Sequence, residues 1–217
     1  VVMIIVIGGR VIPGFTTNTL RRQGVEDRLP LRRAPVDMAC LVLSVAAIVF
    51  LAVDVAKVII GMAALGAAVA NAVRLAGWRS LATLRQPILW VLHLGYGWIV
   101  VAFALLGVAM LSSQVSEIAA FHAFGTGAVG TMTLAIMSRA ALGHTGRPIV
   151  APRPVVAAYL LVTVSALLRT FGPTLAPGLY SELMLLSGAA WIVAFALFTA
   201  VFAPILLQPR VRGDQGA

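Results

Sequence analysis

The feature that most constrains this chain is a series of long apolar blocks, each close to the length that crosses a lipid bilayer. Hydrophobic residues make up 61% of the 217 residues, and only 11% are charged. A soluble domain has about a quarter of its residues charged, whereas ~20 successive apolar residues span a hydrocarbon layer. The sequence therefore predicts an all-α integral membrane protein, a polytopic bundle of transmembrane helices.

Seven blocks qualify as predicted spans. They cover residues 1–12, 37–53, 57–76, 88–111, 118–139, 155–171 and 181–206. The first block is only about half of a full span, so we expect a truncated first span in the C-terminal half of a longer protein whose N-terminal spans are missing. We treat 1–217 as one transmembrane domain. Two spans result over 37–76 if Asp54 and Lys57 pair at the surface. The alternative is one overlong helix, which is not expected because 40 residues would reach ~60 Å.

The basic residues are distributed unevenly between the two sides of these spans. If the spans alternate in direction, one side holds the loops 13–36, 77–87 and 140–154 and the tail 207–217. With the adjoining helix ends, that side receives fourteen of the sixteen basic residues, and only Lys57 and Arg169 fall on the other. Because an excess of Lys and Arg marks cytoplasmic loops, we expect the basic 13–36 loop, the tail and the C-terminus to be cytoplasmic.

Several functional classes find no support in the sequence. The net charge of +9 follows from the topology and favours contact with the lipid bilayer; no recognition motif indicates nucleic-acid binding. Cys40 is the only cysteine, which excludes a disulfide within the chain and a C-x-x-C-H haem attachment. No Ser-His-Asp set and no phosphate-binding glycine loop is present, so hydrolase and kinase chemistry are not indicated.

Two histidines fall inside predicted spans, where ionisable side chains are costly and tend to face the bundle interior. His93 lies about two turns into its span from the cytoplasmic end, and His122 about one turn in from the opposite end. Steps of three and four from His122 reach small or weakly polar residues and one methionine: Gly125, Thr126, Gly130, Thr133 and Met137. We expect this stripe, and a similar one after His93, to face inward, where helices pack closely or a bound group fits.

The depths of the two histidines indicate separate sites. A rise of 1.5 Å per residue places His93 and His122 roughly 15–20 Å apart in depth, too far for opposite axial ligands of one iron. Each could be a neutral imidazole bonded to a neighbouring helix, a metal or haem ligand, or a proton relay. His144 lies beyond its predicted span on the cytoplasmic side, where we expect it to belong with His93.

Two arginines near predicted span ends have two possible roles each. Arg10 follows a Gly-Gly pair and Arg139 ends its predicted span. Either side chain could extend to lipid headgroups or meet a buried anion such as a haem propionate.

Three stretches resemble the NnrS family of polytopic bacterial inner-membrane proteins. They are "IGGRVIPGFTTNTL" (7–20), "WVLHLGYGWIVVAFALLG" (90–107) and "FHAFGTGAVGTMTLAIMSRAALGHTGRP" (121–148). The third stretch is the most specific, because a histidine-led Gly/Thr-rich span that continues into "SRAALGHTGRP" is not a general membrane pattern.

The resemblance implies a haem- and copper-containing protein associated with nitric oxide metabolism or resistance to nitrosative stress. Its partners would be the lipid bilayer, haem, and nitric oxide or metal-nitrosyl species. The motif positions are Arg10, Pro13, His93, His122, Arg139, His144 and Arg147. Among them, we expect His93 and His122 as cofactor ligands, His144 as a further metal ligand, and Arg10 and Arg139 as partners of haem propionates.

The alternative is a proton-coupled transporter or permease without a cofactor, in which the histidines relay protons. Such carriers usually place an acidic residue inside a span. Here the candidates fall near predicted span ends: Asp37, Asp54, Glu117 and Glu182. This distribution favours the cofactor hypothesis.

Overall fold

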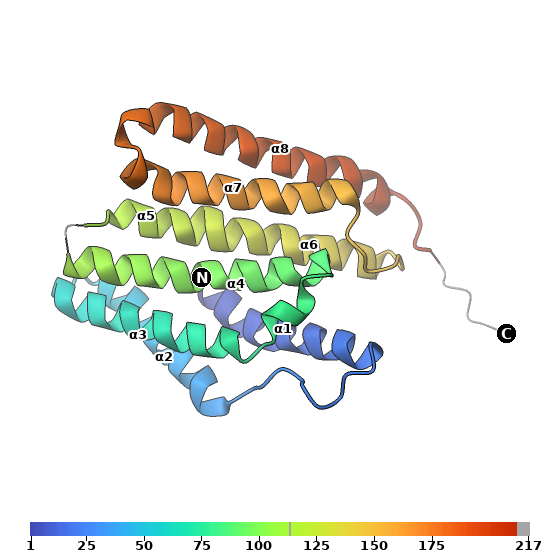
Figure 1. Ribbon diagram of the computed structural model, residues 1–217, viewed down its shortest axis with the longest axis horizontal. Coiled ribbons are helices and arrows are strands. Elements are labelled where there is room, and N and C mark those ends of the chain that lie inside the picture. Colours follow the sequence, from blue (N-terminus) through green and yellow to red (C-terminus); the bar gives the residue numbers. More distant parts are fainter. Residues whose placement is uncertain (113, 212–217) are drawn as a thin grey trace.

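The computed structural model describes residues 1–112 and 114–211, which form helices and no strands (Figure 1). The helices are α1 (Val2–Arg22), α2 (Ala34–Ala52), α3 (Lys57–Ala76), η1 (Ser80–Thr83), α4 (Pro87–Leu111), α5 (Glu117–His122), η2 (Ala123–Gly130), α6 (Thr131–His144), α7 (Arg153–Leu175), η3 (Pro177–Leu179) and α8 (Tyr180–Leu207). Helices α5 and α6 continue into each other through η2, a π-helix. Seven helical segments of the described chain are long and apolar enough to cross a membrane, which confirms the predicted fold class.

Helix α4 lies at the centre of the bundle. It packs against α1 and α3 on one side and against α5, η2 and α6 on the other, and α7 and α8 form the far edge (Figure 1). Glycines allow this close approach: a Cβ at Gly95 would overlap Met132 of α6, and a Cβ at Gly127 would overlap the Trp98 ring. Small residues at helix crossings are the usual means by which membrane helices pack tightly.

Helix α1 is longer than the sequence predicts. The predicted loop over 13–36 is wrong for its first ten residues, because the helix continues to Arg22. Pro13 costs the helix one hydrogen bond, and polar residues that suggested a loop find partners inside the bundle, as Thr16 does with His93 of α4. Consequently Arg10 lies near the middle of α1 and not at a span end.

The break between α2 and α3 is confirmed, but it does not depend on an Asp54–Lys57 ion pair. Residues 53–56 separate the helices, and Asp54 adopts φ 53°, a left-handed conformation that aspartate tolerates. Lys57 Nζ lies 3.3 Å from Glu117 Oε1 at the start of α5 instead. The Lys57–Glu117 ion pair thus links the start of α3 to the start of α5 at the same end of the bundle.

Two boundaries near the arginine-rich end also change. Helix α6 extends to His144, so the loop predicted over 140–154 is reduced to the residues before Arg153. Helix α8 ends at Leu207, and the predicted tail 207–217 lies partly outside the described residues, which stop at 211. In Figure 1 the ends of α1, α6 and α8 and the starts of α4 and α7 lie at the same end of the bundle.

Candidate functional site

His93 is deeply buried, with 4% of its side chain exposed, as predicted for an interior residue. Its Nε2 lies 3.0 Å from Thr16 Oγ1 on α1, and its Nδ1 lies 2.9 Å from Ser80 Oγ on η1. The Trp78 ring packs edge-on against it, with ring centroids 6.3 Å apart. Both ring nitrogens have hydroxyl partners, so neither is free for a metal in this arrangement.

The hydrogen bonds of the two hydroxyl groups indicate which ring nitrogen of His93 carries a proton. Thr16 donates its one hydroxyl proton to the Ile12 carbonyl at 2.9 Å, so toward His93 it can only accept. Nε2 therefore carries a proton. In the neutral form of the ring, Nδ1 is then the acceptor and Ser80 donates to it. This arrangement corresponds to the first expected role, an imidazole bonded to neighbouring segments; metal ligation by His93 stays a prediction that requires one bond to open.

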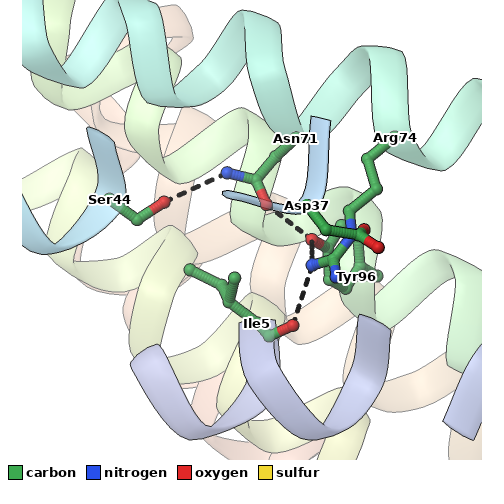
Figure 2. Close-up of polar contacts among 6 residues, drawn as sticks. All are labelled: Ile5, Asp37, Ser44, Asn71, Arg74 and Tyr96. Carbon is green, nitrogen blue, oxygen red and sulfur yellow. Dashed lines mark hydrogen bonds and ion pairs between the residues drawn. The ribbon is translucent and has the colours of Figure 1, made fainter. Parts of the chain in front are cut away.

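A buried polar network joins α1, α2, α3 and α4 (Figure 2). Arg74 Nε donates to Asp37 Oδ1 at 2.6 Å, and Nη1 donates to the Ile5 carbonyl at 2.9 Å and the Tyr96 hydroxyl at 3.1 Å. The exposed fractions of the Arg74 and Asp37 side chains are 8% and 27%. A buried charge is tolerated when it is both paired and hydrogen-bonded, and Arg74 meets both conditions.

The network continues toward the middle of α2 and α3. The Tyr96 hydroxyl donates to Asn71 Oδ1 at 2.5 Å, and Asn71 Nδ2 donates to Ser44 Oγ at 3.1 Å. The sequence interpretation missed this cluster, because it counted Arg74 only among the basic residues of one side. A signal was present, since Asn71 and Arg74 are three residues apart and so share one face of a predicted span.

His122 differs from His93 in both burial and bonding. It is half-buried at the end of α5, and the structure records no hydrogen bond between its ring and another described residue. The π-helix η2 begins directly after His122, and π-helical segments occur frequently at functional sites. Its imidazole could therefore accept a ligand role without breaking an existing contact.

The interior face predicted for this helix is only partly right. Gly130 is buried, and Thr133 and Met137 line a cavity with α1, but Gly125 and Met137 are exposed and Thr126 and Thr133 are half-buried. The buried residues are Ala119, Ala120, Ala123, Gly127, Ala128, Gly130, Thr131, Met132, Leu134, Ala135, Ser138, Ala141 and Leu142. Steps of three and four assume 3.6 residues per turn, and the wider turns of η2 rotate the face that follows.

The packing of α4 against this helix keeps His93 and His122 apart. Helix α4 runs antiparallel to it, since Gly95 faces Met132 while Phe103 packs edge-on against Phe124, with centroids 4.9 Å apart. His93 is thus level with the start of α6 and His122 with the second half of α4. About twelve residues of α4 thus separate the levels of the two histidines, which at 1.5 Å per residue is a difference in depth of roughly 18 Å. This value agrees with the prediction of two separate positions.

Arg139 and His144 are brought together in a groove of about 390 Å³ between α1 and α6. The remaining lining residues are apolar: Ile7, Val11, Phe15, Ile136, Ala140, Gly143 and Ile149. The guanidinium carbon of Arg139 lies 3.6 Å from the centroid of the Phe15 ring, a cation–π contact. His144 is exposed at the end of α6, and His93, with which it was expected to group, does not line this groove.

This groove extends in both directions along α1. Two of its isoleucines also line a cavity of about 430 Å³ toward the middle of the bundle, and Arg139 also lines one of about 410 Å³ at the helix ends. Arg22 and Arg85 share the last cavity, which has no acidic lining residue. An apolar slot that ends in unmatched guanidinium groups is complementary to an amphiphile with anionic groups.

Arg10 lies apart from this groove. It lines a separate groove of about 300 Å³ between α1 and α2, together with Arg32, Asp37 and Arg74. No histidine lines that groove. The expectation that Arg10 binds a haem propionate therefore stays a prediction without a neighbouring imidazole to support it.

The described residues contain no group of three or more His, Cys, Asp or Glu side chains that could hold a metal ion. Each histidine is therefore a single potential ligand in a different setting. Of the expected site residues, the structure brings together only Arg139 and His144.

Comparison with known proteins yields one match. Among curated proteins and solved structures, none matches the chain. The family model described as "NnrS protein" matches residues 1–210, which is essentially the whole sequence and includes all three stretches that carried the resemblance. The chain therefore belongs to the NnrS family.

Proposed function

We propose that this membrane protein binds haem and copper and acts in nitric oxide metabolism or in resistance to nitrosative stress. Family membership supports the class of function, since the NnrS resemblance implies both cofactors. The observation that carries the residue-level proposal is the groove between α1 and α6, where an imidazole, guanidinium groups and apolar walls occur together.

The residues of this groove fit a haem. His144 would supply a nitrogen ligand to the haem iron, because its ring has no recorded hydrogen bond within the described chain. Arg139, with Arg22 and Arg85 beyond it, would hold the propionates, and Phe15 and its aliphatic neighbours would exclude water from the macrocycle. Haem, when bound, would supply an iron that nitric oxide can ligate.

His122 is the candidate for the copper site. Imidazole suits copper, and this half-buried ring, where α5 meets η2, has no recorded hydrogen bond to another described residue. Because no ligand cluster surrounds it among residues 1–112 and 114–211, the remaining ligands would come from outside that set. His93 is proposed as a positioning residue for α1 and η1, in keeping with its two hydroxyl partners.

The absorption spectrum of the purified full-length protein, expressed in haem-replete cells, tests the haem proposal. We expect a Soret band that His144→Ala abolishes or shifts and that Arg139→Gln weakens, while His122→Ala leaves it unchanged. Absence of the band in the unaltered protein would refute haem binding. A band lost in His122→Ala but retained in His144→Ala would refute this choice of groove.

Copper content and response to nitric oxide are tested on the same preparations. We expect metal analysis to show copper that falls in His122→Ala and not in His144→Ala. Nitric oxide added to the reduced protein should shift the Soret band. An unchanged spectrum at saturating nitric oxide would contradict a role in binding this molecule.

The proposed location is a bacterial inner membrane with the arginine-rich end of the bundle in the cytoplasm. Reporter fusions after Arg210 and after Glu117 should be active on opposite sides of the membrane. Cytoplasmic activity of the fusion after Glu117 would reverse this orientation.

A proton-coupled transporter is the second candidate, because the structure places the carboxylate of Asp37 in a spanning helix and against a buried arginine. Asp37 lies in the first turn of α2 and is bound to Arg74. A pair fixed in this way neutralises charge and leaves no open protonation site. Flux driven by a pH gradient in cofactor-free proteoliposomes would favour the transporter over the haem protein.

A further inference from the structure

The groove between α1 and α2 combines basic and apolar walls on the surface of the bundle. It has a volume of about 300 Å³, and Arg10 of α1 and Arg32, just before α2, are its exposed basic residues. The apolar part includes Val6 of α1 with Met38 and Leu41 of α2. Val6 is 41% exposed and Met38 is 61% exposed, so this apolar wall is accessible on the surface of the described helices.

The charge in this groove is not balanced by the chain. Its only carboxylate is Asp37, and Arg74 already holds that group with an Nε–Oδ1 distance of 2.6 Å. The described residues form no ion pair with Arg10 or Arg32. Two guanidinium groups therefore remain unmatched at the mouth of an apolar groove.

The position of Arg10 makes this imbalance costly. Arg10 belongs to a membrane-spanning helix, but it shares the groove with Arg32, just before α2 begins, so both guanidinium groups lie near the start of the α2 span, within reach of lipid headgroups. An unpaired charge beside hydrocarbon is unfavourable there. An anion in the groove would remove that cost, and an arginine can hold a phosphate by two parallel hydrogen bonds. The apolar walls would remain unfilled by a soluble anion but would accept a hydrocarbon chain.

We propose that this groove binds an anionic phospholipid, with the phosphate held by Arg10 and Arg32 and one acyl chain along Val6, Met38 and Leu41. Basic pockets between membrane helices are a general means of binding anionic headgroups. This site is separate from the proposed haem groove, which lies on the α6 side of α1, and it does not depend on the proposed function.

Native mass spectrometry of the full-length protein tests the site, with dioleoyl phosphatidylglycerol and dioleoyl phosphatidylcholine as probes. We expect retention of phosphatidylglycerol and no comparable retention of phosphatidylcholine. The double variant Arg10→Gln/Arg32→Gln should weaken phosphatidylglycerol binding by about tenfold or more, given roughly 1 kcal/mol for each basic residue near an anionic headgroup. The matched control is Arg21→Gln/Arg28→Gln, which removes two exposed arginines that do not line the groove.

A second variant tests the apolar part without changing charge. Val6→Trp should fill the groove and reduce phosphatidylglycerol binding while the protein keeps its helical circular dichroism. Equal binding by the unaltered protein, the double variant and Val6→Trp would overturn the proposal. Displacement of the lipid by millimolar inorganic phosphate would also overturn it, because that result identifies a site for a soluble anion.

Discussion

Both faces of α1 meet arginine and histidine side chains from other helices, but these side chains have more hydrogen-bond partners on one face than on the other. On the face toward α3 and α4, Thr16 bonds to His93 and the Ile5 carbonyl accepts from Arg74. On the face toward α6, Arg139 rests on the Phe15 ring, and no described acidic residue lines the adjoining cavities. A histidine or arginine in a span is therefore structural where its partners are complete and a ligand candidate where they are missing.

The largest effect expected on the first face is that of removing Asp37. Asp37→Ala leaves the buried Arg74 without its counter-charge, and breaking a buried pair typically costs about 3–5 kcal/mol. We expect the lower end of that range, since Asp37 is partly exposed. Unfolding in mixed detergent micelles, followed by circular dichroism, measures the loss.

The exposed pair Lys57–Glu117 is the control for this prediction. Glu117→Ala should change the free energy of unfolding by less than about 1 kcal/mol, as exposed ion pairs do. Equal losses in the two variants would contradict the assignment of Arg74 to a buried network.

The next effect concerns the close approach of α1 to Arg74. A Cβ at Gly9 would overlap the Arg74 guanidinium, which its hydrogen bonds hold in place. Gly9→Ala should therefore destabilise the protein by about 1–3 kcal/mol through overpacking. Gly14→Ala on the same helix is the control, because a Cβ there meets no atom within 4 Å and alanine favours helix; destabilisation by both would point to α1 backbone effects instead.

Features that depend on neighbouring residues could be predicted from the sequence, and features that depend on contacts between distant residues could not. The number of spans follows from local apolar length, which is why seven helices could be predicted. The extension of α1 to Arg22 could not, because Thr16 gains its hydrogen-bond partner from α4, 77 positions away. The inward-facing stripe predicted after His122 is only partly right, because η2 changes the number of residues per turn. A prediction based on fixed spacing does not anticipate such a change.

The candidate site shows the same division. His93, His122 and His144 stand out as the three histidines of the sequence, but their hydrogen-bond partners, which separate structural from available imidazoles, come from tertiary packing. The joint position of Arg139 and His144 does not follow from their spacing, because five residues on an α-helix place two side chains about 140° apart, and the groove that both line is completed by α1. The apolar wall that α1 contributes opposite them could not be inferred, because the packing of α1 against α6 is tertiary and because Phe15 lies beyond residue 12, where the sequence predicted that helix to end.

A smaller loss is expected when the partner of His93 is removed. Thr16→Val leaves the Nε2 proton of a buried imidazole without an acceptor, and hydrogen bonds between membrane helices contribute about 0.6 kcal/mol on average, up to about 1.7. We expect destabilisation near the upper value, with the Soret band unchanged if haem lies on the α6 side. Thr199→Val is the control, because Thr199 makes the same bond to the carbonyl four residues earlier but is exposed. Loss of the Soret band in Thr16→Val would assign the haem to the His93 side and reverse the comparison between the two faces.

The smallest effect concerns the cation–π contact on the α6 face. Phe15→Leu keeps apolar bulk in the groove but removes the ring under Arg139, a contact worth about 0.5–1 kcal/mol at a partly exposed site. A double-mutant cycle with Arg139→Gln isolates this term from the loss of packing, and Phe121→Leu, at an exposed phenylalanine of α5, is the matched control. A coupling energy of about 0.5–1 kcal/mol in protein prepared without haem, and close to zero in the haem-bound form, is expected if the guanidinium leaves the ring to hold a propionate. The same coupling in both preparations would mean that Arg139 stays on Phe15, which would make this face of α1 as structural as the other.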